Sequence, residues 1–209
     1  MRMCWSVKGG SGTTVFASAL AVTLAERQNA TTIIDLCGDV PAVLGIAEPP
    51  GRGVRDWLAS HDRDETHLDT LAVTAAANLR LIPAGMQHSF DAAALEDLMH
   101  ACRGRSVVID FGMLQPPESL RKLAAAEYLV SRPCYLSLRR AARLADRPRA
   151  VVLLNEPGRA LTRRDVQSVV GAPVIAEIAV TDGIARCVDA GLLATRLPKT
   201  LADDLAPLV

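Results

Sequence analysis

The chain has 209 residues, half of them hydrophobic, with 23 basic and 23 acidic side chains. This length and apolar content suit one large α/β domain covering residues 1–209. The zero net charge excludes a global field that would draw the protein toward nucleic acid or anionic lipid, so any such attraction has to be local.

Short apolar runs alternate with longer segments of helical period, a pattern typical of βαβ units. We expect strands at Met3–Val7, Thr31–Leu36, Leu79–Pro83, Ser106–Phe111, Tyr128–Ser131, Ala150–Leu154 and Val174–Ala179. We expect helices near Thr14–Arg27, Val54–Ser60, Ala92–Ala101, Pro117–Ala125, Leu136–Ala145, Thr162–Val169, Gly183–Ala190 and Leu201–Ala206. The polar segment His61–Leu68 is expected to be a surface loop. Several strands are apolar at consecutive positions, which predicts a mostly parallel twisted sheet with helices on both faces.

A glycine-rich loop, Lys8–Thr14, joins the first strand to the first helix. Glycines let successive backbone N–H groups point inward, and the helix N-terminus adds its positive end, so this context predicts a phosphate cradle. The expected phosphate contacts are Gly9, Gly10, Ser11, Gly12, Thr13 and Thr14. Thr14 would also offer its hydroxyl to a nucleotide-bound Mg²⁺. The alternative is that this segment is only a tight turn.

The loop resembles the deviant Walker A motif of the MinD/ParA family of P-loop ATPases, written KGGxGK[ST]. The matching residues are Lys8, Gly9, Gly10, Gly12 and Thr14. The resemblance implies an ATP- and Mg²⁺-binding protein that forms a homodimer, with Lys8 reaching the partner's nucleotide as a catalytic residue. Thr13 stands where the family has its phosphate-contacting lysine, and Val7 replaces the first glycine of the general P-loop pattern. Because charge-assisted contacts are about twice as strong as neutral ones, losing the lysine predicts weaker nucleotide binding.

The second strand ends in Asp35, followed by Cys37 and Asp39, and is similar to an acidic segment of the same family. In the family two acids separated by one residue lie here, and the second orients the attacking water. Cys37 occupies that second position, so Asp35 and Asp39 are the remaining catalytic candidates and hydrolysis should be weakened. The alternative is that both acids are turn and helix-capping residues.

The strand Val107–Gly112 resembles a Walker B strand, with Asp110 near its carboxyl end. Ligands of open α/β sheets bind at that edge, so Asp110 is a candidate Mg²⁺ ligand. Family analogy makes Gly112 a switch residue that senses the terminal phosphate. The alternative is a buried strand that ends in a solvated Asp.

Later segments extend the resemblance over nearly the whole chain. Leu79–Gly85 and Ala172–Gly191 are similar to further family segments. Asn155 resembles the strand-end residue that contacts adenine, although Glu156 replaces the arginine that usually follows. The choice of adenine over guanine therefore depends on Asn155.

The only basic concentration lies in the segment from Arg139 to Arg164. The candidates for DNA phosphate contacts are Arg139, Arg140, Arg143, Arg163 and Arg164. Such binding would be independent of sequence and would weaken steeply with salt. The alternative is a solvated helix face with local ion pairs. The terminal Leu201–Val209 carries two acids and no Lys or Arg, which argues against a MinD-like membrane anchor.

The five cysteines are scattered and lack CxxC spacing, which argues against a disulfide framework and a zinc site. The start of the chain lacks the pattern of a signal peptide, and no apolar run approaches the roughly 20 residues of a membrane span. We therefore expect a cytoplasmic protein, associated with the nucleoid if the arginine segment binds DNA.

Two functions are consistent with these motifs. The first is a nucleotide-dependent dimerising switch for intracellular positioning or partitioning, with slow hydrolysis and a protein partner. The second is a degenerate pseudo-ATPase that acts as a scaffold or adaptor in a division, pilus or secretion complex. Three residues depart from the family pattern: Val7, Thr13 and Cys37. They replace groups that serve nucleotide binding and hydrolysis, and they leave the fold intact, which favours nucleotide binding with feeble turnover.

Overall fold

An eight-stranded sheet forms the centre of the computed structural model, which describes residues 1–27 and 30–209. Its strands are β1 (Arg2–Trp5), β2 (Thr31–Asp35), β3 (Val73–Ala76), β4 (Leu79–Ile82), β5 (Val107–Gly112), β6 (Ala126–Ser131), β7 (Val151–Asn155) and β8 (Val174–Ala179). They lie in the order β3-β4-β2-β5-β1-β6-β7-β8. Every neighbouring pair is parallel except β3 and β4.

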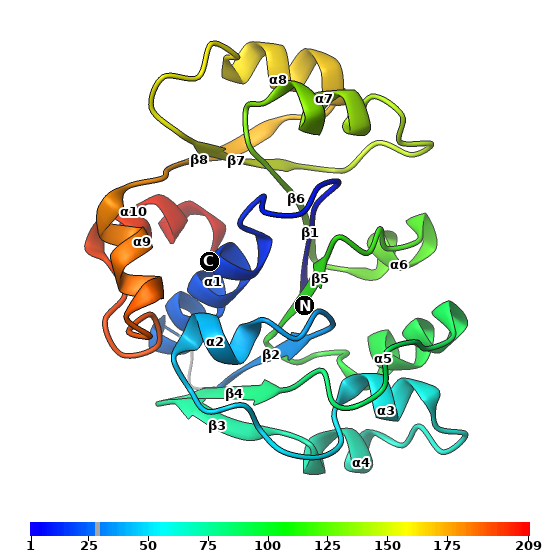
Figure 1. Cartoon of the computed structure of the whole chain (residues 1–209). Helices are drawn as coiled ribbons and strands as arrows, with labels where there is room; N and C mark the ends of the chain where they lie inside the picture. Colours follow the sequence, from blue (N-terminus) through cyan, green and yellow to red (C-terminus); the bar gives the residue numbers. More distant parts are fainter. Residues whose placement is uncertain (28–29) are drawn as a thin grey trace.

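Helices cover both faces of this sheet (Figure 1). One face carries α3 (Val54–Ala59), α4 (Glu65–Thr70), α5 (Leu95–Ala101), α6 (Glu118–Leu123), α7 (Tyr135–Ala141) and α8 (Arg163–Val170). The other carries α1 (Thr13–Arg27), α2 (Val40–Leu44), α9 (Asp182–Asp189) and α10 (Lys199–Leu205). Short 3-10 helices lie at Ala92–Ala94 and Ala206–Leu208. The predicted fold class is therefore confirmed.

Side chains of the central strands alternate between two hydrophobic cores. In β1, Met3 and Trp5 pack with Phe111 on the α3–α8 face, whereas Cys4 packs with Phe16 on the α1 face. The apolar residues of the central strands β1, β2, β5 and β7 are buried on both sides, which is why these strands lack polar alternation. In the edge strand β8, buried and exposed residues alternate.

Helix α1 lies at the centre of one helical layer and is buried along most of its length. It packs on β5 and β2 and is flanked by α2 and α10. Because neighbours surround it, small and apolar residues occupy nearly its whole circumference. This packing fixes the N-terminal end of α1 next to the end of β1.

Every strand predicted from the sequence is present, with ends shifted by at most two residues. Strand β3 was missed because it is a short edge strand, VTAA, that is only half-buried and has no apolar run. The loop predicted at His61–Leu68 is wrong over its second half, where α4 begins at Glu65. Asp64 caps α4 by accepting a hydrogen bond from the Thr66 amide, and Leu68 anchors it in the core.

The cysteines are all free thiols, with Cys4 and Cys102 buried and the other three half-buried. Among residues 1–27 and 30–209, no helix combines the length and the apolar character that crossing a membrane requires.

Candidate functional site

Three loops meet at the carboxyl edge of the sheet. They follow the neighbouring strands β2, β5 and β1, and together they line an open cleft of about 1100 Å³. The lining includes Lys8 to Val15, Cys37, Asp39, and the segment from Phe111 to Leu114. This is the edge at which open parallel sheets bind ligands.

The glycine loop curls tightly onto the start of α1. Gly10 and Gly12 have φ angles of 70° and 89°, in the left-handed region that favours glycine. The Ser11 hydroxyl donates to the Lys8 carbonyl at 2.7 Å, which closes the loop. Among the described residues, the backbone N–H groups of Gly10, Gly12 and Thr13 have no hydrogen-bond acceptor. Unpaired amides at a helix N-terminus have the geometry of an anion cradle.

Gly12 is required for space as well as for its backbone angle. A Cβ placed on it would lie 2.6 Å from Cδ1 of Leu154, near the end of β7. The loop therefore passes directly over β7, and only a glycine fits at this crossing without moving Leu154.

The Lys8 side chain folds back over its own loop. Its Nζ donates to the Gly9 carbonyl at 2.8 Å. The Arg140 guanidinium donates to the carbonyl of Val7, the residue before Lys8, at 3.2 Å. Thus Lys8 lies at the mouth of the cleft, attached in this chain by a hydrogen bond to a main-chain oxygen.

Asp110 is fully buried at the end of β5, beside the glycine loop. Its Oδ1 accepts a hydrogen bond from the Gly112 amide at 2.9 Å. Its Oδ2 has no hydrogen-bond partner among the described residues. Burial raises the pKa of Asp110 to about 6, while the nearby Thr14 hydroxyl and Gly112 amide act in the opposite direction. The structure thus brings Thr14 and Asp110 together, and the spare carboxylate oxygen fits a cation site.

Asp35 organises the turn between β2 and α2. Its Oδ1 accepts from the Cys37 amide at 2.8 Å and the Gly38 amide at 2.7 Å, and its Oδ2 accepts from the Val40 amide at 3.0 Å. Burial raises the pKa of Asp35, opposed by these amides and by the positive charge of Arg55. Asp35 therefore has the turn-forming role that the sequence offered as the alternative to a catalytic one.

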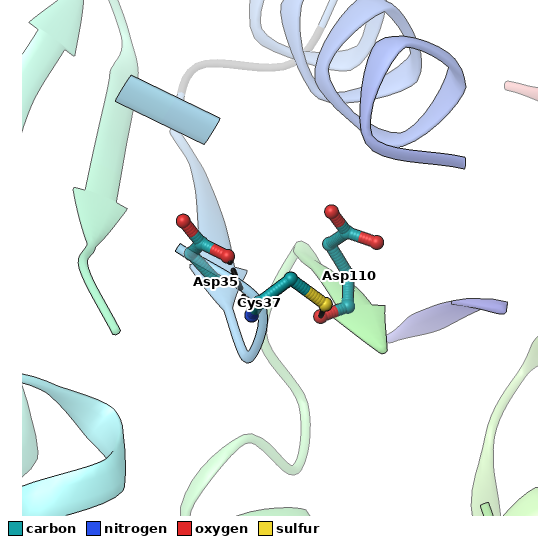
Figure 2. A group of neighbouring side chains, drawn as sticks. All are labelled: Asp35, Cys37 and Asp110. Carbon is teal, nitrogen blue, oxygen red and sulfur yellow. Dashed lines mark hydrogen bonds between the residues drawn. The ribbon is translucent and has the colours of Figure 1, made fainter. Parts of the chain in front are cut away.

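Cys37 and Asp39 follow Asp35 on the wall of the cleft. The Cys37 sulfur lies 3.7 Å from the Asp110 carbonyl oxygen, and Figure 2 shows it between the two strand ends. Burial, followed by the charges of Asp110 and Asp35, raises the pKa of the Cys37 thiol far above its usual range. Asp39 is exposed and is the N-cap residue of α2, but its side chain makes no capping hydrogen bond.

Solved structures of similar shape are ATPases and cell-division proteins. A ParA family ATPase from Chlorobium tepidum TLS aligns with a TM-score of 0.78 and 19% identity, over 99% of this chain and 95% of that chain. The septum site-determining protein MinD complexed with Mg-ADP, from Pyrococcus horikoshii OT3, aligns with 0.73 and 20%, over 100% and 94%. A chain of the MinC:MinD cell division protein complex of Aquifex aeolicus aligns with a TM-score of 0.73 and 17% identity, over 99% of this chain and 94% of that chain.

This chain has the ParA/MinD fold. The predicted resemblance to the MinD/ParA family is thereby confirmed at the level of the fold. No family profile matches the sequence, and a search of curated proteins finds no match.

The position predicted to contact adenine lies at the end of β7 in this ParA/MinD fold. The Asn155 amide nitrogen donates to Glu177 Oε2 at 2.7 Å. A smaller, mostly apolar pocket of about 170 Å³ lies beside it, and Gly12 and Val15 line both this pocket and the main cleft. Asn155 itself does not line the pocket, whereas its neighbour Leu154 does.

Two arginines at these cavities were missed by the sequence reasoning. Arg55 on α3 lines the main cleft and donates to the Leu36 carbonyl through Nε at 3.1 Å and Nη2 at 2.7 Å. Arg132, just after β6, lines the smaller pocket and pairs with Glu156. Neither belongs to a local motif, so only the folded chain indicates its position.

The arginine segment spans two adjacent helices of the fold, α7 and α8 (Figure 1). Arg163 is engaged with Gln167, Glu177 and the Val174 carbonyl. Within the described part of the chain, the side chains of Arg139, Arg143 and Arg164 make no hydrogen bond or ion pair. The segment is thus partly neutralised by local ion pairs, and DNA contact by its remaining arginines stays a prediction.

Proposed function

We propose that this chain is a nucleotide-binding switch protein of the ParA/MinD type. It binds ATP with Mg²⁺ in the main cleft and dimerises in response, with weak or lost hydrolysis. The observation that carries this proposal is the curled loop. Its residues Gly10, Gly12 and Thr13, whose amides lack an acceptor among the described residues, line a cleft large enough for a nucleotide. A structurally similar MinD is complexed with Mg-ADP, which supports the same class of ligand here.

Each group has a definite task in this proposal. The loop amides bind phosphate oxygens, which lowers the need for the lysine that Thr13 replaces. Thr14 and Asp110 would hold Mg²⁺, because the buried Oδ2 of Asp110 lacks a partner among the described residues. When bound, Mg²⁺ supplies positive charge that neutralises the phosphates. Among the described residues the Lys8 side chain bonds to a single main-chain oxygen, so it is able to leave its loop and contact the nucleotide of a partner subunit.

Feeble turnover follows from the chemistry of Cys37. A neutral, half-buried thiol cannot replace a carboxylate in orienting or deprotonating an attacking water. Losing one electrostatic stabiliser costs roughly 10²–10³ in rate. The exposed carboxylate of Asp39 lines the cleft and is the acid left to act on water.

A scaffold or adaptor in a division, pilus or secretion complex is the second candidate. The observation that favours it is that Thr13 and Cys37 both face the cleft, so both departures fall on the reacting part of the site. In either function we place the protein in the cytoplasm with a protein partner, and nucleoid association depends on DNA binding by the arginine segment.

Calorimetry of ATP binding with Mg²⁺, paired with light scattering, tests the proposal. We expect ATP-dependent dimerisation of the wild-type chain and its loss in Lys8→Ala. The matched control is Lys199→Ala, which removes an exposed lysine paired with Asp203 on α10. A constitutive oligomer that ignores ATP would favour the scaffold. Absence of both ATP binding and dimerisation would overturn the switch.

A further inference from the structure

Three potential metal ligands converge between the ends of β2 and β5. A carboxylate oxygen of Asp35, the sulfur of Cys37 and a carboxylate oxygen of Asp110 all lie within 4.8 Å of one another. Asp35 and Asp110 face each other in the register of these paired strands, and Cys37 projects from the turn that follows β2 (Figure 2). Three different backbone positions thus supply ligand atoms to one small cluster.

The cluster carries negative charge that protein groups compensate only in part. Both carboxylates belong to residues with no exposed surface. The Oδ2 of Asp110 is buried and, among the described residues, accepts no hydrogen bond. A buried acceptor without a partner is costly, so this oxygen indicates a missing positive group. Arg55 is the cation that acts on Asp35, but its guanidinium is held on the Leu36 carbonyl.

We infer that Asp35, Cys37 and Asp110 form a site for a thiophilic divalent cation of the Zn²⁺ class, with water completing the coordination. Thiolate ligands favour Zn²⁺ and related metals, whereas Mg²⁺ prefers oxygen ligands alone. Three protein ligands plus one water is a common zinc arrangement. Asp35 Oδ1 accepts two backbone amides, whereas Oδ2 accepts one and therefore keeps a lone pair for a cation. These backbone contacts orient the carboxylate. Binding releases the thiol proton of Cys37 to solvent.

This metal site is separate from the proposed nucleotide binding, because all its protein ligands belong to this chain and no nucleotide is needed to hold the cation. Asp110 is also the carboxylate assigned to Mg²⁺, so the two cations compete for it. A thiophilic cation would therefore weaken Mg-nucleotide binding in the wild-type chain and weaken it less in a variant without the thiol.

Cobalt absorption spectroscopy on the full chain without nucleotide tests the site. We expect Co²⁺ to produce a thiolate-to-cobalt charge-transfer band that saturates at a single equivalent. Cys37→Ser should abolish the band and weaken Co²⁺ binding by about tenfold or more. Cys187→Ser is the matched control, because that half-buried thiol bonds to the Arg196 carbonyl outside the cluster. Absence of a band in the wild type, or its survival in Cys37→Ser, would overturn the inference.

A measurement on the unmutated chain covers the case in which a variant fails to fold. Zn²⁺ should protect Cys37 from alkylation by iodoacetamide, as read by peptide mass spectrometry, while half-buried Cys134 stays equally reactive. Equal alkylation of Cys37 with and without Zn²⁺ would contradict the site. Neither experiment includes nucleotide. A negative result would therefore count against the metal site and leave the proposed nucleotide switch untouched.

Discussion

Gly112 and Cys37 are in such close contact that a Cβ on Gly112 would lie 2.2 Å from the Cys37 sulfur. Gly112 has a φ of 52°, and its carbonyl oxygen accepts from the Ser6 amide at 2.7 Å. The residue thus joins the turns that follow β2 and β5 to the start of the glycine loop. Any side chain at this position has to displace one of these turns.

Gly112→Ala should lower the free energy of unfolding by about 2 kcal/mol or more, from backbone strain plus the displaced sulfur. Urea denaturation measures this loss. Gly104→Ala is the control, since Gly104 has a φ of 76° but nothing within 4 Å of an added Cβ, so only about 1 kcal/mol should be lost there. Adding Cys37→Ala to Gly112→Ala should recover part of the difference. Equal losses in the two single variants would show that the contact with Cys37 costs nothing.

Thr13→Lys should strengthen ATP binding by about tenfold, because a charged contact to phosphate is worth roughly 1.5–3 kcal/mol. Thr13 is the first residue of α1 and lines the cleft, so a longer side chain there can reach the bound phosphates. Thr13→Met is the matched control for size without charge. Calorimetry giving the same affinity for both variants would remove Thr13 as the cause of weak binding.

Cys37→Asp should raise ATP turnover by roughly a hundredfold, since it restores a carboxylate beside the attacking water. Phosphate release with saturating Mg²⁺ and ATP is the measurement, and Cys37→Asn is the control of equal size. A variant that binds ATP normally without faster turnover would mean that another feature of the cleft limits hydrolysis.

The sequence predicts which strand ends and which loop form the site, because these features depend on local sequence patterns. An apolar run that ends in a carboxylate identifies both Asp35 and Asp110, and a glycine loop before a helix identifies Lys8–Thr14. Parallel strands then bring these ends to one edge of the sheet. The backbone rules alone therefore place Thr14 close to Asp110.

The remaining features depend on contacts between distant segments, which no local pattern encodes. Arg55 reaches the cleft from α3, and Arg132 reaches the smaller pocket from the end of β6. The approach of Cys37 to Asp110 requires the turn after β2 to adopt the shape that Asp35 imposes through three backbone amides. From the sequence, Cys37 indicates only that the expected acid is absent. Its closeness to Asp35 and Asp110 is evident only in the folded chain.

The arginine segment should bind DNA through the side chains that have no partner in the described chain. Arg139→Ala combined with Arg143→Ala should weaken DNA retention at low salt, because each lost contact with a DNA phosphate lowers the affinity for all DNA sequences equally. The log–log dependence of affinity on salt should become shallower by about 2. Arg140 is left in place because it contacts the Val7 carbonyl next to the glycine loop. Arg103→Ala, an exposed arginine after α5, is the control, and unchanged retention in the double variant would identify the segment as a solvated face.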